Sequence, residues 1–316
     1  MKTIKKIIWY TCTTVIICII GIWVQIQYGI SKEKNFEENI QRENTYEFLL
    51  ENYDGSECNN LKLKSVENKF NYKVKFINDY DDSKFMLCAY IDYKQIEFSP
   101  NNEGLTNCYR FNVNKHNSIE IPIEFDTSQY TDGRHILNFV IYPKVEDEII
   151  NDKENSKFAP IVSIHDLIIN SEDEINREQI LNVGTYEGDN EELFKFELKT
   201  SNEELSEECM SIDVNSNEVI KLPLKVGKME SVDDYLFFYT LDGVEELIDD
   251  KYENYYFKLS TGEVMKKDVM LKVPSKKGSY KLIGFIILNP WSKVSDEDST
   301  NPTYIENSDT FTINVK

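Results

Sequence analysis

The sequence has few of the residues from which catalytic and metal sites are usually built. It contains three histidines and twelve glycines in 316 residues. It has no His-x-x-x-His or Cys-x-x-Cys spacing, no Gly-x-Ser-x-Gly and no glycine-rich phosphate loop. A zinc site would need ligands from distant segments, so we expect structural roles for His116, His135 and His165. The sequence therefore marks no catalytic, cofactor-binding or metal-ligating residue.

Basic side chains are also scarce. Lysines and arginines number 35 against 56 acidic residues, which gives a formal charge of −21 and a pI near 4.6. Nucleic-acid binding depends on clustered Lys and Arg that displace counterions, so we expect no nucleic-acid partner. A hydrophobic content of 41% argues against a disordered acidic chain. With only two alanines and four arginines, the composition is typical of an AT-rich genome such as that of a low-GC Gram-positive bacterium.

Charge is absent from Ile7 to Ile30, directly after three lysines in the first six residues. As a helix this segment would reach about 36 Å, enough for a hydrocarbon layer of ~30 Å with some tilt. A cleaved signal peptide is the alternative, but it has a shorter apolar core and a small-residue cleavage site, which is missing here. We predict a cytoplasmic tail over 1–6 and a single-pass transmembrane signal anchor over 7–30. The remainder is then extracellular, and it carries −24 once the three tail lysines are set aside.

The pattern of the exported part changes from helical to alternating. Residues 31–55 have loosely helical apolar spacing, which predicts a short helical stalk. From residue 56 onward short segments alternate polar and apolar residues between turn signals, as half-buried strands do. The sequence predicts an all-β ectodomain of two tandem immunoglobulin-like β-sandwich domains, over 56–143 and 160–316, joined by an acidic linker over 144–159.

The two halves resemble each other over roughly 60 residues. The runs that match in order and approximate spacing are Phe85–Asp92 with Leu236–Asp242, Tyr109–Phe111 with Tyr255–Phe257, Ile119–Ile123 with Asp268–Val273, and Gly133–Leu137 with Gly278–Leu282. Any two sandwiches share alternation and turns, so chance similarity is the alternative. We favour a tandem duplication.

Cysteines allow disulfides but do not require them. Cys12 and Cys18 lie in the predicted anchor, and the exported cysteines are Cys58, Cys88, Cys108 and Cys209. Cys88 and Cys108 form the best single pair, because they are twenty residues apart on strands that could be neighbours. The alternative is that Cys88 is buried and reduced, which we favour because a domain of this size needs no covalent staple.

Two further groups of residues could bind ligands. Acidic clusters at Asp79–Asp82, Glu187–Glu192 and Asp296–Asp298 could hold calcium weakly, although solvated loops are the simpler interpretation. Trp291 is the only tryptophan beyond the anchor, and with Tyr304 it could form a stacking platform for a sugar or peptide. A tryptophan that caps a core is the commoner case.

These observations favour a membrane-anchored bacterial cell-surface protein that is not an enzyme. Binding, adhesion or service as an accessory subunit would fit tandem β-sandwich modules, with a protein or cell-wall polymer as partner. The alternative is an enzyme that acts on cell-wall glycans through acidic residues that the sequence does not identify.

Overall fold

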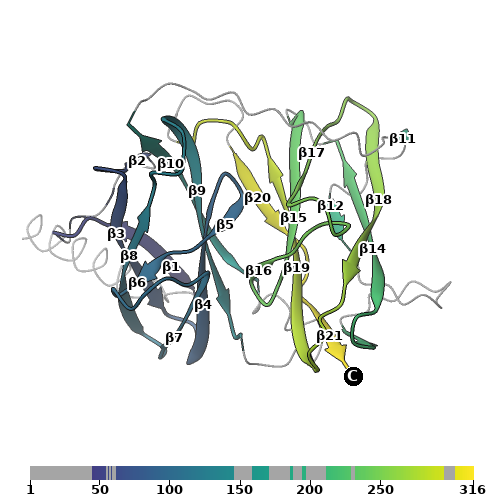
Figure 1. Cartoon of the computed structure of the whole chain (residues 1–316), viewed down its shortest axis with the longest axis horizontal. Coiled ribbons are helices and arrows are strands. Elements are labelled where there is room, and N and C mark those ends of the chain that lie inside the picture. Colours follow the sequence, from purple (N-terminus) through teal and green to yellow (C-terminus); the bar gives the residue numbers. More distant parts are fainter. Residues whose placement is uncertain are drawn as a thin grey trace, which may run out of the picture. The chain divides into compact units, whose positions relative to one another are not determined.

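A computed structural model describes residues 45–54, 56, 58, 62–145, 159–170, 186–187, 194–196, 211–228, 232–294 and 303–316. Every regular element in these ranges is a β-strand (Figure 1). No helix within them is long and apolar enough to cross a membrane. The predicted tail and anchor over 1–30, and the stalk up to residue 44, lie outside the described residues.

The first sandwich has two sheets that enclose one core. Its outer sheet is ordered β1 (Tyr46–Glu51), β3 (Lys69–Asn78), β8 (Asn117–Asp126) and β6 (Ser99–Pro100). Its inner sheet is ordered β2 (Lys62–Lys64), β10 (Ile161–Ile169), β9 (Gly133–Pro143), β4 (Ser83–Ile91) and β5 (Lys94–Ile96), and β7 (Cys108–Val113) also pairs with β4. These orders match the A-B-E-D and G-F-C sheets of the immunoglobulin fold.

The second sandwich repeats most of this arrangement, but the strand beside β18 is β11, which precedes β12 in the sequence, whereas the strand beside β8 is β6, which follows β5. Its outer sheet is ordered β11 (Tyr186–Glu187), β18 (Glu263–Lys272), β14 (Val219–Gly227) and β12 (Phe194–Phe196). Its inner sheet is ordered β13 (Ser211–Val214), β21 (Phe311–Val315), β19 (Gly278–Leu288), β15 (Asp234–Leu241) and β16 (Val244–Glu245); β17 (Tyr255–Lys258) also pairs with β15, and β20 (Tyr304–Asn307) with β19. The all-β, immunoglobulin-like prediction is confirmed.

The predicted correspondence between the halves is confirmed by this topology. In both halves a short strand pairs in parallel with the last strand, β2 with β10 and β13 with β21. The four matched runs fall on β4 and β15, β7 and β17, β8 and β18, and β9 and β19. The copies differ at their last strand, because β20 and β21 share along β19 the place that β10 alone takes along β9.

Two predicted boundaries are wrong. The stalk prediction fails at its end, because Tyr46–Glu51 is the edge strand β1, paired along its length with β3. The apolar residues there face the first core rather than a helical stripe, and Leu50 is buried in that core. The predicted start of the second domain at residue 160 is also wrong, because β10 pairs with β9 and places Leu167 and Ile169 in the first core.

The two sandwiches are not independent domains joined only by a linker, because a third hydrophobic core lies between their inner sheets. Residues 46–316 form one compact unit. Alternate side chains of the inner strands point away from each sandwich's own core and pack together: Met86, Cys88, Tyr90, Val140 and Tyr142 from the first, with Leu236, Phe238, Ile283, Phe285 and Ile287 from the second. Burial on both faces explains why β4 is apolar almost throughout, as a central strand should be.

Candidate functional site

The junction between the sandwiches is built by two equivalent hairpins. One links β4 to β5 through Asp92 and Tyr93, and the other links β15 to β16 through Asp242 and Gly243. All four turn residues have positive φ, the geometry of a two-residue hairpin turn. Each aspartate exchanges hydrogen bonds with the strand beside it. Asp92 N–H donates to the Ile136 carbonyl at 2.8 Å and Asp92 Oδ1 accepts from Ile136 N–H at 3.1 Å.

Asp242 repeats these two bonds with Lys281, both at 2.7 Å. Burial raises the pKa of the Asp242 carboxyl, although the Lys281 N–H opposes that shift. The two equivalent aspartates thus fix both hairpins by the same pair of hydrogen bonds.

Reciprocal hydrogen bonds join the two hairpins at equivalent positions, and we call this set of contacts the clasp. Gln95 N–H donates to Glu245 Oε2 at 2.7 Å, and Glu245 N–H donates to Gln95 Oε1 at 3.1 Å. Gln95 Nε2 also donates to the Gly243 carbonyl at 2.9 Å, and Lys94 forms an ion pair with Glu253 at 2.5 Å. These bonds fix the register between the sandwiches, which apolar packing alone would specify weakly.

Glu245 is the most perturbed carboxyl of this clasp. Burial raises its pKa to about 7, and the charge of Glu253 adds to the shift, while the Gln95 N–H opposes it. Within the described structure its Oε1 is buried and has no hydrogen-bond partner. A shielded carboxyl with such a pKa marks a candidate functional residue, but its contacts also give it a packing role.

A second set of polar contacts holds the segment after β19. Tyr93 Oη donates to the Pro290 carbonyl at 2.6 Å, and the Arg134 guanidinium donates to the Trp291 and Ser292 carbonyls at 2.5 and 3.1 Å. Arg134 also forms a buried ion pair with Asp166 at 3.1 Å. Side chains of the first sandwich therefore donate hydrogen bonds to backbone carbonyls of the second at two places, the second hairpin and the segment after β19.

Trp291 caps the third core, which confirms the simpler of its two interpretations. Its ring packs edge-on against Tyr93 and Tyr256, with centroids 5.6 and 6.3 Å away. Tyr304 is 56% exposed on β20. The proposed stacking platform of these two residues is not what the structure shows, because Trp291 is committed to the junction.

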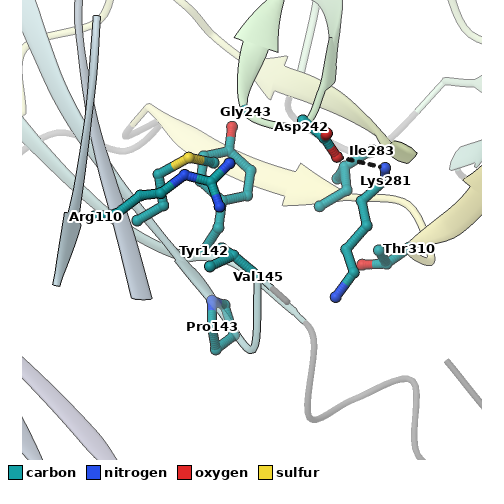
Figure 2. Close-up of a pocket in the computed structure, with 10 residues that line it drawn as sticks. Arg110, Tyr142, Pro143, Val145, Asp242, Gly243, Lys281, Ile283 and Thr310 are labelled. Atoms are coloured by element: carbon teal, nitrogen blue, oxygen red, sulfur yellow. Dashed lines mark hydrogen bonds between the residues drawn. The ribbon is translucent and has the colours of Figure 1, made fainter. Parts of the chain in front are cut away.

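A pocket opens beside the second hairpin (Figure 2). It encloses about 350 Å³, part of it open to solvent, and its walls include Met86, Tyr142 and Ile283. Arg110 and Lys281 lie on opposite sides of it, with Gly243 above Tyr142. The Lys281 ammonium donates to the Lys144 carbonyl at 2.5 Å. The pocket therefore has polar as well as apolar walls, and residues of both sandwiches line it.

Cys88 and Cys108 lie under the same hairpin as free thiols. They are register partners on β4 and β7, as neighbouring strands would require, and their Sγ atoms are 2.8 Å apart. Cys88 is fully buried in the third core, as expected, and Cys108 is partly exposed. Cys58 is the other described cysteine, whereas Cys12, Cys18 and Cys209 lie outside the described residues.

The histidines are scattered. His135 is buried between Asp92, at 2.7 Å, and the Thr131 carbonyl, at 2.8 Å. His165 contacts Ser163 Oγ at 2.7 Å, and burial lowers its pKa to about 4. His116 lies beside Asp79 at 3.1 Å. Across the described ranges no three His, Cys, Asp or Glu side chains gather as metal ligands.

The acidic clusters that the sequence singled out are dispersed as well. Asp81 pairs with Lys144 at 2.9 Å, and Asp82 accepts from Lys115 N–H at 2.7 Å, so these carboxylates do not converge on one point. The side chains of Glu187–Glu192 and Asp296–Asp298 lie outside those that the structure describes.

The outer sheets carry charge in two different ways. On the first sandwich every lysine of the outer face of β3 has a carboxylate: Lys69 pairs with Glu124 at 3.3 Å, Lys73 with Glu120 at 3.5 Å, and Lys75 with Glu51 at 2.9 Å.

On the second sandwich the outer positions of β14 and β18 carry four lysines and one acid: Lys221, Lys225, Lys266, Lys272 and Asp268. Lys225 is the register partner of both Lys266 and Lys195, and Lys221 lies 3.8 Å from Asp268. We call the four lysines the lysine face. Like charges directly opposite each other on neighbouring strands repel, and Lys225 also has a further interaction within the chain.

Comparison with known proteins adds no family. No protein-family model matches the chain, and no curated protein sequence matches it. Solved structures that it is similar to include a CARDB domain from Pyrococcus furiosus, with 12% identity over 40% of this chain and 85% of that one, TM-score 0.25. The C-terminal domain of the Streptococcus pyogenes antigen I/II-family protein AspA has 10% identity over 85% and 99%, TM-score 0.24.

A type II cohesin dyad from the ScaA scaffoldin of Acetivibrio cellulolyticus has 9% identity over 74% of this chain and 93% of that one, TM-score 0.23. Scores this low carry no argument about function. The fold rests on its own strand order.

Sequence reasoning missed the residues of the clasp. Asp92 and Asp242 are the last residues of two matched runs, Gln95 and Glu245 each lie three residues further on, and nothing in their type marks them. The signal was the repeat itself, because aligning Ile91-Asp92 with Leu241-Asp242 sets Gln95 opposite Glu245.

Proposed function

We propose that the chain is a non-catalytic binding module that presents the lysine face of its second sandwich to an acidic protein partner. The observation that carries the proposal is the contrast between the two outer sheets. On the first outer sheet three lysines pair with three carboxylates, whereas on the second Lys221, Lys266 and Lys272 lie around the single carboxylate of Asp268. Such a local excess of positive charge on an acidic protein would steer an acidic surface to this face.

The rigid junction supports the same proposal. A third core and a polar clasp hold the sandwiches as one body, so the lysine face keeps a fixed direction relative to the rest of the unit. A binding surface gains affinity from such preorganisation because little freedom is lost on association.

We further propose that residues 7–30 anchor the protein in the cell membrane, with residues 31–316 outside. The support is the uncharged run and the preceding lysines. Protease treatment of intact cells should degrade the sandwiches while a cytoplasmic control protein survives. Complete protection of the chain in intact but not lysed cells would contradict this topology.

An enzyme that acts on cell-wall glycans is the alternative, and Glu245 is the one observation in its favour. Its raised pKa suits a general acid. Glycosidases, however, need a second carboxyl across an open cleft, about 5–10 Å away. Glu245 instead accepts a hydrogen bond from Gln95 within the clasp, which favours a packing role.

Photo-crosslinking in intact cells tests the binding proposal. A photoreactive amino acid would replace Met270, which lies on the outer side of β18 with Lys221 as its register partner. We expect a product that proteases degrade, and its loss in the Lys266→Gln/Lys272→Gln variant. High salt should weaken it as well, because the contact is electrostatic.

The matched controls change the same charge or use the same probe elsewhere. Lys276→Gln/Lys277→Gln removes two exposed lysines from the turn before β19 and should leave the product intact. The probe at Asn71, on the ion-paired face, should give none. A product from Asn71 but not Met270, or one resistant to proteases and degraded by polymer hydrolases, would contradict the proposed partner.

A further inference from the structure

We propose that Cys88 and Cys108 are a site of oxidative modification, where disulfide exchange with a disulfide oxidant joins β4 to β7. Directly opposed residues of antiparallel strands have Cα atoms about 4.5–5.5 Å apart, which lies within the range that a disulfide spans. The two residues are such partners, and their sulfur atoms already face each other at 2.8 Å. The pair needs no backbone movement to close.

The surroundings of the two sulfur atoms differ, which assigns their roles. Cys108 is partly exposed, and its pKa is lowered by the Cys88 hydrogen bond, by Gln95 and by the nearby Arg110. Gln95 Nε2 donates to its Sγ at 3.3 Å. Cys88 is fully buried, and burial raises its pKa well above the ordinary value. Cys108 is therefore the thiol that an oxidant meets, and Cys88 is the resolving thiol.

The reaction balances as two successive exchanges. The Cys108 thiolate attacks one sulfur of the oxidant disulfide, the oxidant's S–S bond breaks, and half of it leaves as a thiolate that takes up the Cys108 proton. Cys88 then attacks the Cys108 sulfur, the mixed disulfide breaks, and the second half leaves with the Cys88 proton. The cysteine pair gives up two electrons, and the oxidant is reduced to two thiols.

The Gly243 carbonyl of the second hairpin would keep hydrogen-bond donors after the disulfide forms. Both thiols lie under the Gly243 carbonyl, at 3.5 Å for Cys88 and 3.6 Å for Cys108, and neither sulfur can donate once the disulfide forms. The carbonyl keeps Gln95 Nε2 at 2.9 Å and Tyr90 Oη at 3.4 Å as donors. Oxidation would thus fasten edge strand β7 onto β4 without releasing the second hairpin.

The test uses the full-length protein, purified in detergent, reduced, and then equilibrated with glutathione disulfide. Free thiols are alkylated and the peptides are identified by mass spectrometry. We expect a peptide of β4 linked to a peptide of β7, with Cys58 alkylated. Alkylation of both Cys88 and Cys108 in the oxidised sample, or linkage of either mainly to Cys58 or Cys209, would overturn the proposal.

Single variants test the assigned roles. In Cys88→Ser the resolving thiol is missing, so Cys108 should accumulate as a mixed disulfide with glutathione. In Cys108→Ser the buried Cys88 should stay unmodified in the folded protein. Cys58→Ser is the matched control and should leave the linked peptides unchanged. Equal modification of Cys88 and Cys108 in the two variants would contradict the order of attack, and the wild-type result does not depend on how the variants fold.

Discussion

Gly243 shows how much one residue of the junction is constrained. Its φ of +75° lies in the left-handed region, and an added Cβ would clash with the Met86 methyl and lie 3.3 and 3.4 Å from Tyr142 and Cys88. The equivalent Tyr93 has a similar φ of +66°, but its ring reaches over the Pro290 segment. The position therefore admits a side chain in one copy and excludes it in the other.

Gly243→Ala should destabilise the protein by more than the backbone conformation alone explains. The left-handed φ costs about 1–2 kcal/mol for alanine, and crowding against the first sandwich adds about 1–3 kcal/mol. Chemical denaturation measures the loss. Gly262→Ala is the matched control, because Gly262 has a φ of +84° and no atom near its would-be Cβ. Equal losses in the two variants would mean that the hairpin is not tightly seated.

Glu245 should make stability depend on pH. In the fold its pKa rises from the ordinary value of 4.5 to about 7, so between these values the folded state binds a proton that the unfolded chain releases. Proton binding by Glu245 therefore stabilises the folded state. Its contribution to the free energy of unfolding is complete below about pH 4.5 and is lost as pH rises through about 7. Glu245→Gln should remove this component, and it should stabilise the protein at pH 8 relative to wild type.

Denaturation curves at several pH values would show the difference between Glu245→Gln and wild type. Glu103→Gln removes the charge of an exposed carboxylate that is not part of the clasp and should leave the slope of stability with pH unchanged. An identical pH profile for Glu245→Gln and wild type would show that this carboxyl is not buried as described.

At the scale of elements, much of the fold could be predicted from the sequence, and the failures have a common cause. Alternation between turn signals predicts the strands, and the matched run Phe85–Asp92 falls on the central strand β4. The alternation of polar and apolar residues does not indicate which sheet a strand joins. The charged segment before β10 therefore led to the wrong prediction that β10 belongs to the second domain. The clasp was not predictable for a related reason, since Gln95 and Glu245 gain meaning only from a non-local contact.

The assignment of β10 can be checked with two fragments. A fragment of residues 46–170 keeps β10, whereas one of residues 46–143 loses it and exposes the edge of β9. Both fragments expose the same third-core face, so their difference isolates β10. We expect the longer one to resist proteolysis markedly better, because Leu167 and Ile169 complete the first core. Equal sensitivity would mean that β10 contributes little to the first sandwich.

At the scale of the whole molecule, the third core and not the connecting segment holds the sandwiches together. Phe238 and Phe285 stack with centroids 4.9 Å apart, and both sides of each inner sheet are buried. Unfolding should therefore be cooperative across residues 46–316, and the length of the connection between β10 and β11, which leads from the first sandwich to the second, should matter little.

Insertion of ten Gly/Ser residues within 171–185, between β10 and β11, tests this directly. Doubling a loop costs only about 0.6 kcal/mol, so calorimetry should show one transition with nearly the wild-type Tm. Phe285→Ala should instead lower stability by about 3–5 kcal/mol. Two separate transitions after the insertion, with Phe285→Ala harmless, would show that the sandwiches are independent.

The clasp between Gln95 and Glu245 has a consequence for how such a molecule could arise. These residues hold equivalent positions in the two copies, and each donates its backbone N–H to the other's side chain. That is the signature of an approximate two-fold axis, as in a symmetric homodimer. We infer that the ancestor was a single sandwich that paired with itself through its inner sheet, and that fusion of two genes made the pairing permanent. Once the two halves were one chain they could diverge, and the outer strands β3 and β8 now differ from β14 and β18 in how lysines and carboxylates are arranged.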